Sequence, residues 1–269
     1  MKLSISNIAW PSEEEEKFLK YIRKWGCSGV EIAPSRLWPE PLEATKKDRL
    51  SFKSLVRKYD LDISALQALL YGQRGLGLFR SPEIEEKTIE YLKGLCQLAA
   101  DLDARVLVFG SPANRKRGSI PLQTAYERAA TFFSKVASAA KDLGVCICIE
   151  PLRPQETDFI TTAMEGLKLV SMVNNEGFGL HLDAKAVAEE GGNFSDIFRT
   201  VIFKLKHFHI NDPGLTEVNS TKKVDHKSMG LALKNAGYKS YVSIEMRKLP
   251  DYFNVIKRSL LEAKEAYLN

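Results

Sequence analysis

Four segments in the second half of the sequence share one pattern: ICIEP at residues 147–151, GLHLDA at 179–184, HFHIN at 207–211 and VSIEM at 242–246. Each is a short apolar run, rich in residues that favour strands, and it contains a carboxylate or an imidazole near its end. Helical patterns separate these runs along the chain. The arrangement therefore predicts strands that alternate with helices in a parallel sheet.

The same alternation extends back to the N-terminus. Eight strands are expected, at residues 3–8, 29–33, 62–68, 105–110, 145–150, 177–183, 205–210 and 241–245. Apolar residues repeat every three or four positions over residues 84–102 and 126–143, which predicts helices between strands. No linker rich in Pro, Gly or Ser divides the 269 residues, and eight strand–helix units typically need about 250. We therefore predict one α/β domain over residues 1–269 with the (β/α)8 fold, the TIM barrel, and an open doubly wound sheet as the alternative.

Local signals mark where several helices begin and end. Ser12 with Glu15, and Thr162 with Glu165, have the spacing of capping boxes. Gly144 follows the helical pattern that ends at residue 143, as expected of a glycine that stops a helix. No glycine-rich loop follows the first strand, so a dinucleotide is not expected, because its pyrophosphate needs close contact with the backbone.

Composition disfavours several classes of protein. No run of 18 apolar residues and no signal-peptide pattern is present, so we expect no membrane association. The net charge is +5, from 39 basic and 34 acidic residues spread over the whole chain, which gives no reason to expect nucleic acid as a partner. The four cysteines lie in apolar segments without a CxxC pair, so reduced thiols and a cytoplasmic location are expected.

The polar ends of strands five to eight form the candidate site. They are Glu150, Asp183, His209 and Glu245. In a parallel barrel the carboxyl ends of the strands meet on one face, so these side chains are expected to converge. Three carboxylates in one cavity repel each other unless a cation lies between them, which predicts one divalent metal ion with these four ligands. Mainly oxygen ligands with one imidazole favour Mn²⁺, with Mg²⁺, Zn²⁺ and Co²⁺ as alternatives.

Other polar residues are expected to have different roles. Strand parity places His181 and His207 inside the barrel, one layer below the site, where we expect hydrogen-bonded interior histidines. Glu31 in the second strand is also expected to be structural. The basic run from Arg115 to Arg117 follows the fourth strand on the face of the site, so Arg115 is a candidate for binding a phosphate or carboxylate.

The order Glu, Asp, His, Glu on strands five to eight, in the phrases ICIEP, GLHLD, HFHIND and GYKSYVSIEM, resembles the xylose isomerase-like TIM barrel superfamily of sugar phosphate isomerases and epimerases. The resemblance covers essentially the whole chain, and its specific part is the second half. It implies that Glu150, Asp183, His209 and Glu245 bind the metal, with Glu150 and Glu245 also as the acid/base pair. Glu156 matches a substrate-contacting glutamate of the ketose epimerases.

Two positions depart from the ketose epimerases. Those enzymes continue from the metal-binding aspartate as D-x-x-H, where this chain has Ala186. They also carry an arginine six residues after the metal-binding histidine, where this chain has Leu215. The metal ligands are therefore intact, whereas part of the substrate contacts differs. The identity of the sugar, and whether it carries phosphate, stays open.

The implied reaction is an aldose–ketose isomerisation or a C3 epimerisation of a sugar or sugar phosphate. One glutamate would remove a proton to give a cis-enediolate, and the other would return a proton to the opposite face or the adjacent carbon. The metal would stabilise the negative charge. Trp10 and Trp38, near the ends of the first two strands, are candidates for packing on the sugar, and Gln67 for donating to a hydroxyl group.

Two other functions stay open. An endonuclease IV-like metal-dependent phosphodiesterase would share the barrel, but such enzymes bind several zinc ions through many histidines, and this chain has four. A sugar-binding protein with reduced catalysis would keep the metal ligands, and Ala186 and Leu215 agree with this function. The sequence also leaves open whether the chain forms a homo-oligomer.

Overall fold

The computed structural model describes residues 1–269 and contains a closed barrel of eight parallel strands, in which β1 pairs with both β2 and β8. The strands are β1 (Lys2–Ser6), β2 (Gly29–Ile32), β3 (Asp62–Leu66), β4 (Val106–Phe109), β5 (Cys146–Ile149), β6 (Phe178–Asp183), β7 (Leu205–Ile210) and β8 (Tyr241–Ile244). Every predicted strand is present. Closure of the sheet confirms the TIM barrel and excludes the open doubly wound sheet.

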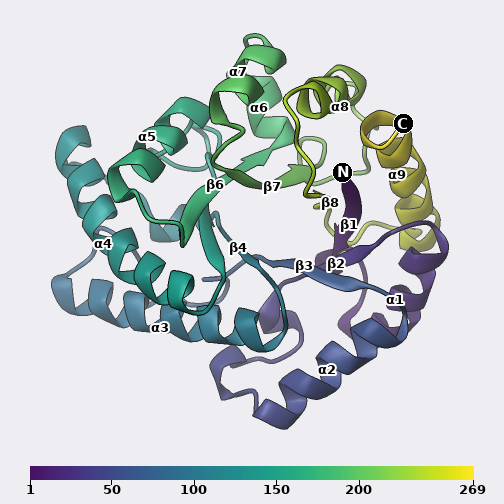
Figure 1. Cartoon of the computed structure of the whole chain (residues 1–269), viewed down its shortest axis with the longest axis horizontal. Coiled ribbons are helices and arrows are strands. Elements are labelled where there is room, and N and C mark those ends of the chain that lie inside the picture. Colours follow the sequence, from purple (N-terminus) through teal and green to yellow (C-terminus); the bar gives the residue numbers. More distant parts are fainter.

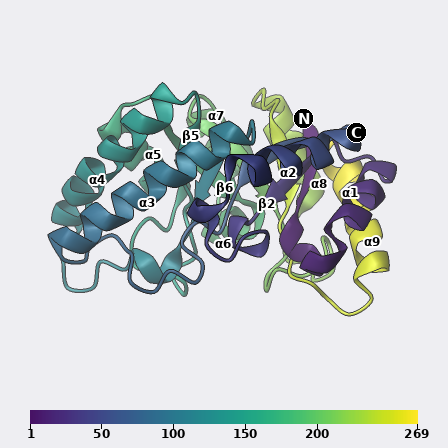
Figure 2. The same ribbon diagram turned by 90° about the horizontal axis from the view of Figure 1, so that it is seen from below.

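Helices surround the barrel on all sides (Figure 1). They are α1 (Glu15–Lys24), α2 (Lys46–Lys58), α3 (Pro82–Asp101), α4 (Leu122–Asp142), α5 (Ala163–Val173), α6 (Ala184–Glu190), α7 (Phe194–Val201), α8 (His226–Asn235) and α9 (Tyr252–Tyr267). Two short helices, α6 and α7, connect β6 to β7. Figure 2 shows the ring from below, with α2 and α3 in front of the strands.

The alternation of side chains along the strands produces two apolar regions. Ile147 and Ile149 of β5 belong to the large core between the sheet and the helices. A second, small cluster fills the barrel interior; its members are Ala65, Val106, Val108, Cys146 and Cys148. All four cysteines are free and buried, as predicted. Because alternate residues face the interior, the residue that follows Ile149 points toward the barrel axis.

Two of the predicted helix boundaries are confirmed. The Thr162 hydroxyl accepts a hydrogen bond from the backbone N–H of Glu165 at the start of α5. The Glu165 carboxylate accepts from the backbone of Thr161 rather than of Thr162, so only half of the capping box forms. Gly144 follows α4 with a φ of +68°, a left-handed conformation that glycine adopts without strain.

The capping box predicted at Ser12 and Glu15 is wrong. Ser12 lies in a short 3-10 helix before α1, and no side chain caps α1. Glu15 is buried, and its Oε2 accepts a hydrogen bond of 3.0 Å from Trp10 Nε1. The carboxylate therefore satisfies a buried indole instead of a helix end, a tertiary contact that residue spacing does not encode.

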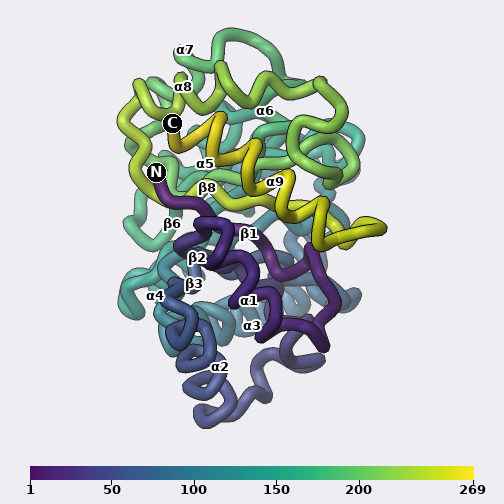
Figure 3. Tube along the Cα trace, turned by 90° about the vertical axis from the view of Figure 1, so that its right-hand side faces the viewer, coloured from purple at the N-terminus to yellow at the C-terminus, as the bar shows by residue number.

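Close contacts between the first and last helices complete the barrel. Tyr21 of α1 donates to the backbone oxygen of Phe253 in α9 at 3.0 Å, and their rings lie 5.2 Å apart. Figure 3 shows α9 beside α1. Gly230 of α8 packs so closely against the backbone of Ala266 that a methyl group there would overlap its carbonyl oxygen. No helix is long and apolar enough to span a membrane.

Candidate metal centre

The four predicted ligands lie at the carboxyl ends of adjacent strands. Asp183 is the last residue of β6, and it pairs in register with His209 of β7. Glu150 and Glu245 directly follow β5 and β8. Asp183 and His209 are buried, and the Glu245 side chain is only 14% exposed. The fold thus places all four side chains at one end of the barrel, with little access to water.

His209 belongs to three overlapping groups of candidate ligands, one of which it forms with Glu31 and His207. Potential ligand atoms of Asp183, His209 and Glu245 all lie within 4.8 Å of one another. Glu150 satisfies the same limit with His209 and His181, but not with the other two carboxylates together. The structure therefore brings three of the predicted ligands into one group, and Glu150 adjoins that group through His209.

Glu31 holds the His209 ring in place. His209 Nε2 donates to Glu31 Oε1 at 2.9 Å, while Nδ1 has no hydrogen-bond partner and lies 3.5 Å from Glu245 Oε2. Burial would lower the pKa of His209, but the charges of Glu31 and Glu245 outweigh it and raise this pKa well above its usual value. The free nitrogen of the ring therefore faces the carboxylates.

Glu31 is a residue of the candidate site that sequence reasoning did not place there. It is fully buried and accepts three hydrogen bonds, from His209, from His207 Nε2 at 3.1 Å and from Ser243 Oγ at 2.9 Å. The expected structural role is right in that Glu31 contacts other protein groups. The sequence did contain a signal: Glu31 is the one carboxylate in an otherwise apolar strand, at a position of β2 that faces the barrel interior.

Asp183 is saturated by donors of the protein. Its Oδ1 accepts from the backbone N–H groups of Lys185 and Ala186, at 2.9 and 3.1 Å, and so caps α6. Its Oδ2 accepts from Asn211 Nδ2 at 2.6 Å and from Lys185 Nζ at 3.0 Å. Burial would raise the pKa of Asp183, but the charges of Lys185 and His209 outweigh it and lower this pKa. Asp183 is therefore ionised at neutral pH.

Glu150 occupies a less compensated position. Burial, and next the charge of Glu245, raise the pKa of Glu150 to about 8. Its Oε1 lies 3.8 Å from His181 Nε2, too far for a hydrogen bond. Both ring nitrogens of His181 are buried without partners, so the expectation of a hydrogen-bonded interior histidine is wrong there, whereas His207 donates to Glu31.

The donor set fits a divalent cation. An ion with ligand bonds of about 2.0–2.2 Å holds ligand atoms up to about 4.4 Å apart, close to the 4.8 Å within which the atoms of Asp183, His209 and Glu245 lie. His209 Nδ1 is a buried nitrogen without a partner, and Nε2 of the same ring donates to a carboxylate, which is the usual arrangement of a metal-binding histidine. Lys185 Nζ is the one lysine nitrogen that contacts Asp183 Oδ2, at 3.0 Å.

The structure places Trp10 in the core, which corrects the expectation that it contacts a sugar. Trp10 has no exposed surface, stacks on Phe18 with ring centroids 5.2 Å apart, and bonds to Glu15. Trp38 is half-buried and contacts Phe52 of α2 edge to face. Its ring is therefore the more accessible of the two.

Gln67 lies just past the end of β3 and is buried, with Nε2 donating to Ser6 Oγ at 2.7 Å. This bond uses one of the two N–H groups of the Gln67 amide, which was expected to donate to a substrate hydroxyl group. The second amide proton and the carbonyl oxygen have no side-chain contact of their own in the structure.

Glu156 and Arg115 lie in the loops after β5 and β4. Glu156 accepts from Arg153 Nε at 2.9 Å and is half-buried. Arg115 has no exposed surface, and its Nε and Nη1 groups have no partner. Burial lowers the pKa of Arg115 to about 10, although the charges of Glu150 and Glu156 act in the opposite direction. Arg115 is therefore a buried cation with free donors, close enough to Glu150 for their charges to interact.

The two positions that depart from the ketose epimerases lie in the segments that follow β6 and β7. Ala186 is buried, its backbone N–H donates to Asp183 Oδ1, and its methyl group offers no polar contact from this position. Leu215 has a φ of +52° in the loop after β7, and its carbonyl oxygen accepts from the backbone N–H of Arg247. Leu215 therefore ties this loop to the segment that follows Glu245.

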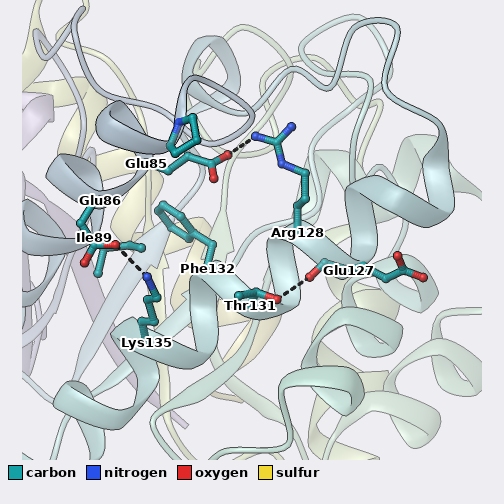
Figure 4. Close-up of a pocket in the computed structure, with 9 residues that line it drawn as sticks. Glu85, Glu86, Ile89, Glu127, Arg128, Thr131, Phe132 and Lys135 are labelled. Carbon is teal, nitrogen blue, oxygen red and sulfur yellow. Dashed lines mark hydrogen bonds and ion pairs between the residues drawn. The ribbon is translucent and has the colours of Figure 1, made fainter.

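A surface pocket lies between α3 and α4, on the outside of the ring of helices (Figure 4). Four of its five charged groups are paired: Glu85 with Arg128 at 2.5 Å and Glu86 with Lys135 at 2.7 Å. None of its lining residues follows a strand at the carboxyl end of the barrel. It is therefore separate from the candidate metal centre.

Comparisons with known proteins agree with this fold. A family model described as xylose isomerase-like TIM barrel matches residues 19–263. A D-psicose 3-epimerase of Agrobacterium fabrum is 31% identical over 120 residues, which cover 45% of this chain but only 41% of that protein. A D-psicose 3-epimerase of Ruminiclostridium cellulolyticum is 24% identical over 261 residues, 91% of this chain and 83% of that protein.

Among solved structures, a D-allulose 3-epimerase from Methylomonas sp., in complex with D-allulose, has a TM-score of 0.82. It is 19% identical, and the match covers 99% of this chain and 97% of that one. At this identity the likeness shows the shared fold. Since the family model matches most of the sequence and the closed barrel agrees with it, the chain belongs to the xylose isomerase-like TIM barrel family.

Proposed function

We propose that this protein is a divalent-metal-dependent isomerase or epimerase of a sugar or sugar phosphate. The observation that carries the proposal is the convergence of Asp183, His209 and Glu245, with a free imidazole nitrogen facing the carboxylates and Glu150 beside the same ring. Relatives named as D-psicose 3-epimerases support a ketose as the substrate. The oxygen-rich donor set supports Mn²⁺ as the ion.

In this proposal Glu150 and Glu245 move the proton. A bound divalent ion would polarise the carbonyl and adjacent hydroxyl oxygens of the sugar, which makes the neighbouring C–H bond more acidic. In the metal-free protein, burial and the charge of Glu245 raise the pKa of Glu150, a direction that suits a carboxyl group that must hold a proton as well as release it. Glu245 approaches the shared histidine from β8, whereas Glu150 approaches from β5. Two carboxyl groups on different strands suit proton removal on one side of a substrate and return on the other.

Other contacts with the substrate are proposed for Arg115, Glu156, Gln67 and Trp38. Arg115 has two unpartnered N–H groups, which oxygen atoms of a sugar or of a phosphate would satisfy. Glu156 and Gln67 each have a protein partner, so they would bind substrate through their remaining oxygen and amide positions. Trp38 offers a half-buried ring for the apolar face of a sugar.

Deuterium exchange tests the acid/base assignment. The wild-type protein, loaded with Mn²⁺, is incubated in D2O with a panel of ketoses that includes D-psicose, and deuterium in the sugar is followed by NMR. Glu150→Gln and Glu245→Gln should each abolish exchange, because an amide cannot accept the proton. Glu90→Gln, an exposed carboxylate of α3, is the control and should leave exchange unchanged. Exchange that persists in both site variants would remove these residues from the role.

A sugar-binding protein with reduced catalysis is the second candidate function. Ala186 and Leu215 differ from the residues of the ketose epimerases, and Lys185 forms an ion pair with the candidate ligand Asp183. Binding of a ketose without exchange in the wild-type protein would establish it. The nuclease alternative is less well supported, because His226 bonds to Asp212 and Tyr267 and belongs to none of the candidate ligand groups. Two or three metal ions per chain, rather than one, would favour the nuclease.

A further inference from the structure

Lys185 is the only buried lysine of the chain, and its ammonium group lies within the carboxylate cluster. It is the second residue of α6, and its side chain folds back onto the residue that caps this helix. Nζ donates to Asp183 Oδ2 at 3.0 Å. Glu150 and Glu245 are close enough for their charges to act on the same ammonium group. A buried lysine of this kind requires paired negative charge, and here the candidate metal ligands supply it.

The four hydrogen bonds of Asp183 differ in how easily they can be released. Two come from backbone N–H groups at the start of α6, at 2.9 and 3.1 Å, and a third comes from Asn211 at 2.6 Å. Only the bond from Lys185 Nζ ends on a long, flexible side chain. Because a carboxylate has about four acceptor positions, an ion that binds Asp183 must replace one of these donors. Lys185 Nζ is the donor that can leave by rotation of its own long side chain, with α6 and the segment after β7 unchanged.

Charge leads to the same conclusion. An ammonium group and a divalent cation on one carboxylate oxygen repel each other strongly in a site shielded from water. Without an ion, however, removal of Lys185 would leave Asp183 and Glu245 with His209 as their close cation, and Glu150 with His209 and Arg115. The lysine therefore has opposite effects in the two states: it stabilises the carboxylates without the ion and opposes the ion when it binds.

We propose that Lys185 is an internal counter-ion, which holds Asp183 in the metal-free protein and is displaced from Oδ2 when a divalent ion binds. The inference rests on the metal site proposed above and adds a residue that sets its affinity. It assigns Lys185 a competitive role, whereas a purely structural lysine would leave metal affinity unchanged or, when removed, weaken it.

The test compares Lys185→Met and Lys185→Gln with the wild-type protein after removal of metal. Mn²⁺ binding is measured from the electron paramagnetic resonance signal of the free ion, and thermal midpoints are measured with and without Mn²⁺. Both variants should bind Mn²⁺ about tenfold or more tightly than wild type, because the ion no longer replaces a charge-assisted hydrogen bond. Without metal, the thermal midpoints of both variants should be lower than that of wild type. Saturating Mn²⁺ should raise the thermal midpoint of each variant by more degrees than it raises the midpoint of wild type.

Lys227→Met is the matched control, since Lys227 forms an exposed ion pair with Glu265 away from the site. It should change neither Mn²⁺ affinity nor the response to Mn²⁺. Equal or weaker Mn²⁺ affinity in the Lys185 variants would overturn the inference. If a variant is unfolded without metal, folding on addition of Mn²⁺ supports the inference, and failure to fold at saturating Mn²⁺ overturns it. Absence of Mn²⁺ binding in wild type and variants alike would instead refute the proposed metal site.

Discussion

Glu31→Gln isolates the effect of the charge that orients His209. Glu31 Oε1 accepts from both His207 and His209, and Oε2 accepts from Ser243. If the amide nitrogen of the glutamine takes the place of Oε2, the Ser243 hydroxyl group can rotate to accept from it. The carbonyl oxygen then still accepts from both histidines. The substitution therefore keeps the shape of the site and removes its negative charge.

The magnitude follows from those contacts. A hydrogen bond to a charged group contributes about 1.5–3 kcal/mol and one between neutral groups about 1 kcal/mol. Two histidine bonds would each weaken by about 1 kcal/mol, so the free energy of unfolding should fall by about 2 kcal/mol and the thermal midpoint by about 4–8 °C. Mn²⁺ affinity should fall about 10–100-fold, as for other groups that orient a metal ligand, because a neutral partner makes His209 a weaker base.

The assay is Mn²⁺ titration of the metal-free protein, followed by the resonance signal of the free ion. Ser243→Ala is the control, because it removes a partner of Glu31 but leaves both histidine bonds in place. It should change Mn²⁺ affinity by less than about threefold, well below the range expected for loss of an orienting carboxylate. A Glu31→Gln affinity within twofold of wild type, or an equal loss in Ser243→Ala, would refute the role of Glu31 in orienting His209.

Three further predictions concern stability. Burial raises the pKa of Glu15 to about 7, so its stabilising effect is complete below about pH 4.5 and is lost as pH rises through 7. Denaturant titrations of wild type and Glu15→Gln measure this effect. Relative to the variant, the free energy of unfolding of wild type should fall by about 3 kcal/mol between pH 4.5 and 7.5. Equal pH dependence of the two proteins would contradict this. Gly230→Ala should lower the free energy of unfolding by about 1–3 kcal/mol, because its methyl group would overlap the backbone of α9. Gly75→Ala, at a position with open space, should be nearly neutral. Equal thermal midpoints of the two variants in calorimetry would exclude the clash. Asp212→Asn should weaken the bonds to Thr221 and increase hydrogen exchange in residues 213–221, with unchanged exchange as the contrary result.

Much of the fold follows from local sequence. The eight strands could be predicted because their lengths, their strand-forming residues and the helical periods between them are properties of short segments. Strand parity also predicts which residues face the interior, as the separate cluster around Cys146 and Cys148 shows. Closure followed from the number of strand–helix units and the length of the chain, because a parallel sheet of eight such units in about 250 residues has few alternatives.

The convergence of Glu150, Asp183, His209 and Glu245 was likewise predictable, since parallel strands end on one face of a barrel. The contacts of these residues were not. Glu31 and His209 are far apart in the sequence, and β2 and β7 face each other only across the closed barrel. A pattern of residue types identifies a strand end, but it does not identify which side chain from the opposite wall bonds to it.

The sequence by itself determined the eight strands and the strand ends at which polar groups lie, because these depend on hydrophobic periodicity and segment length, and it favoured the barrel over an open sheet. Only the tertiary structure decided the burial of Trp10 against Phe18, the free donors of Arg115 and the position of the Lys185 ammonium group on Asp183. Burial and charge pairing depend on distances between segments that the chain brings together after folding. The same residue types at the same spacing would have no such partners in another packing.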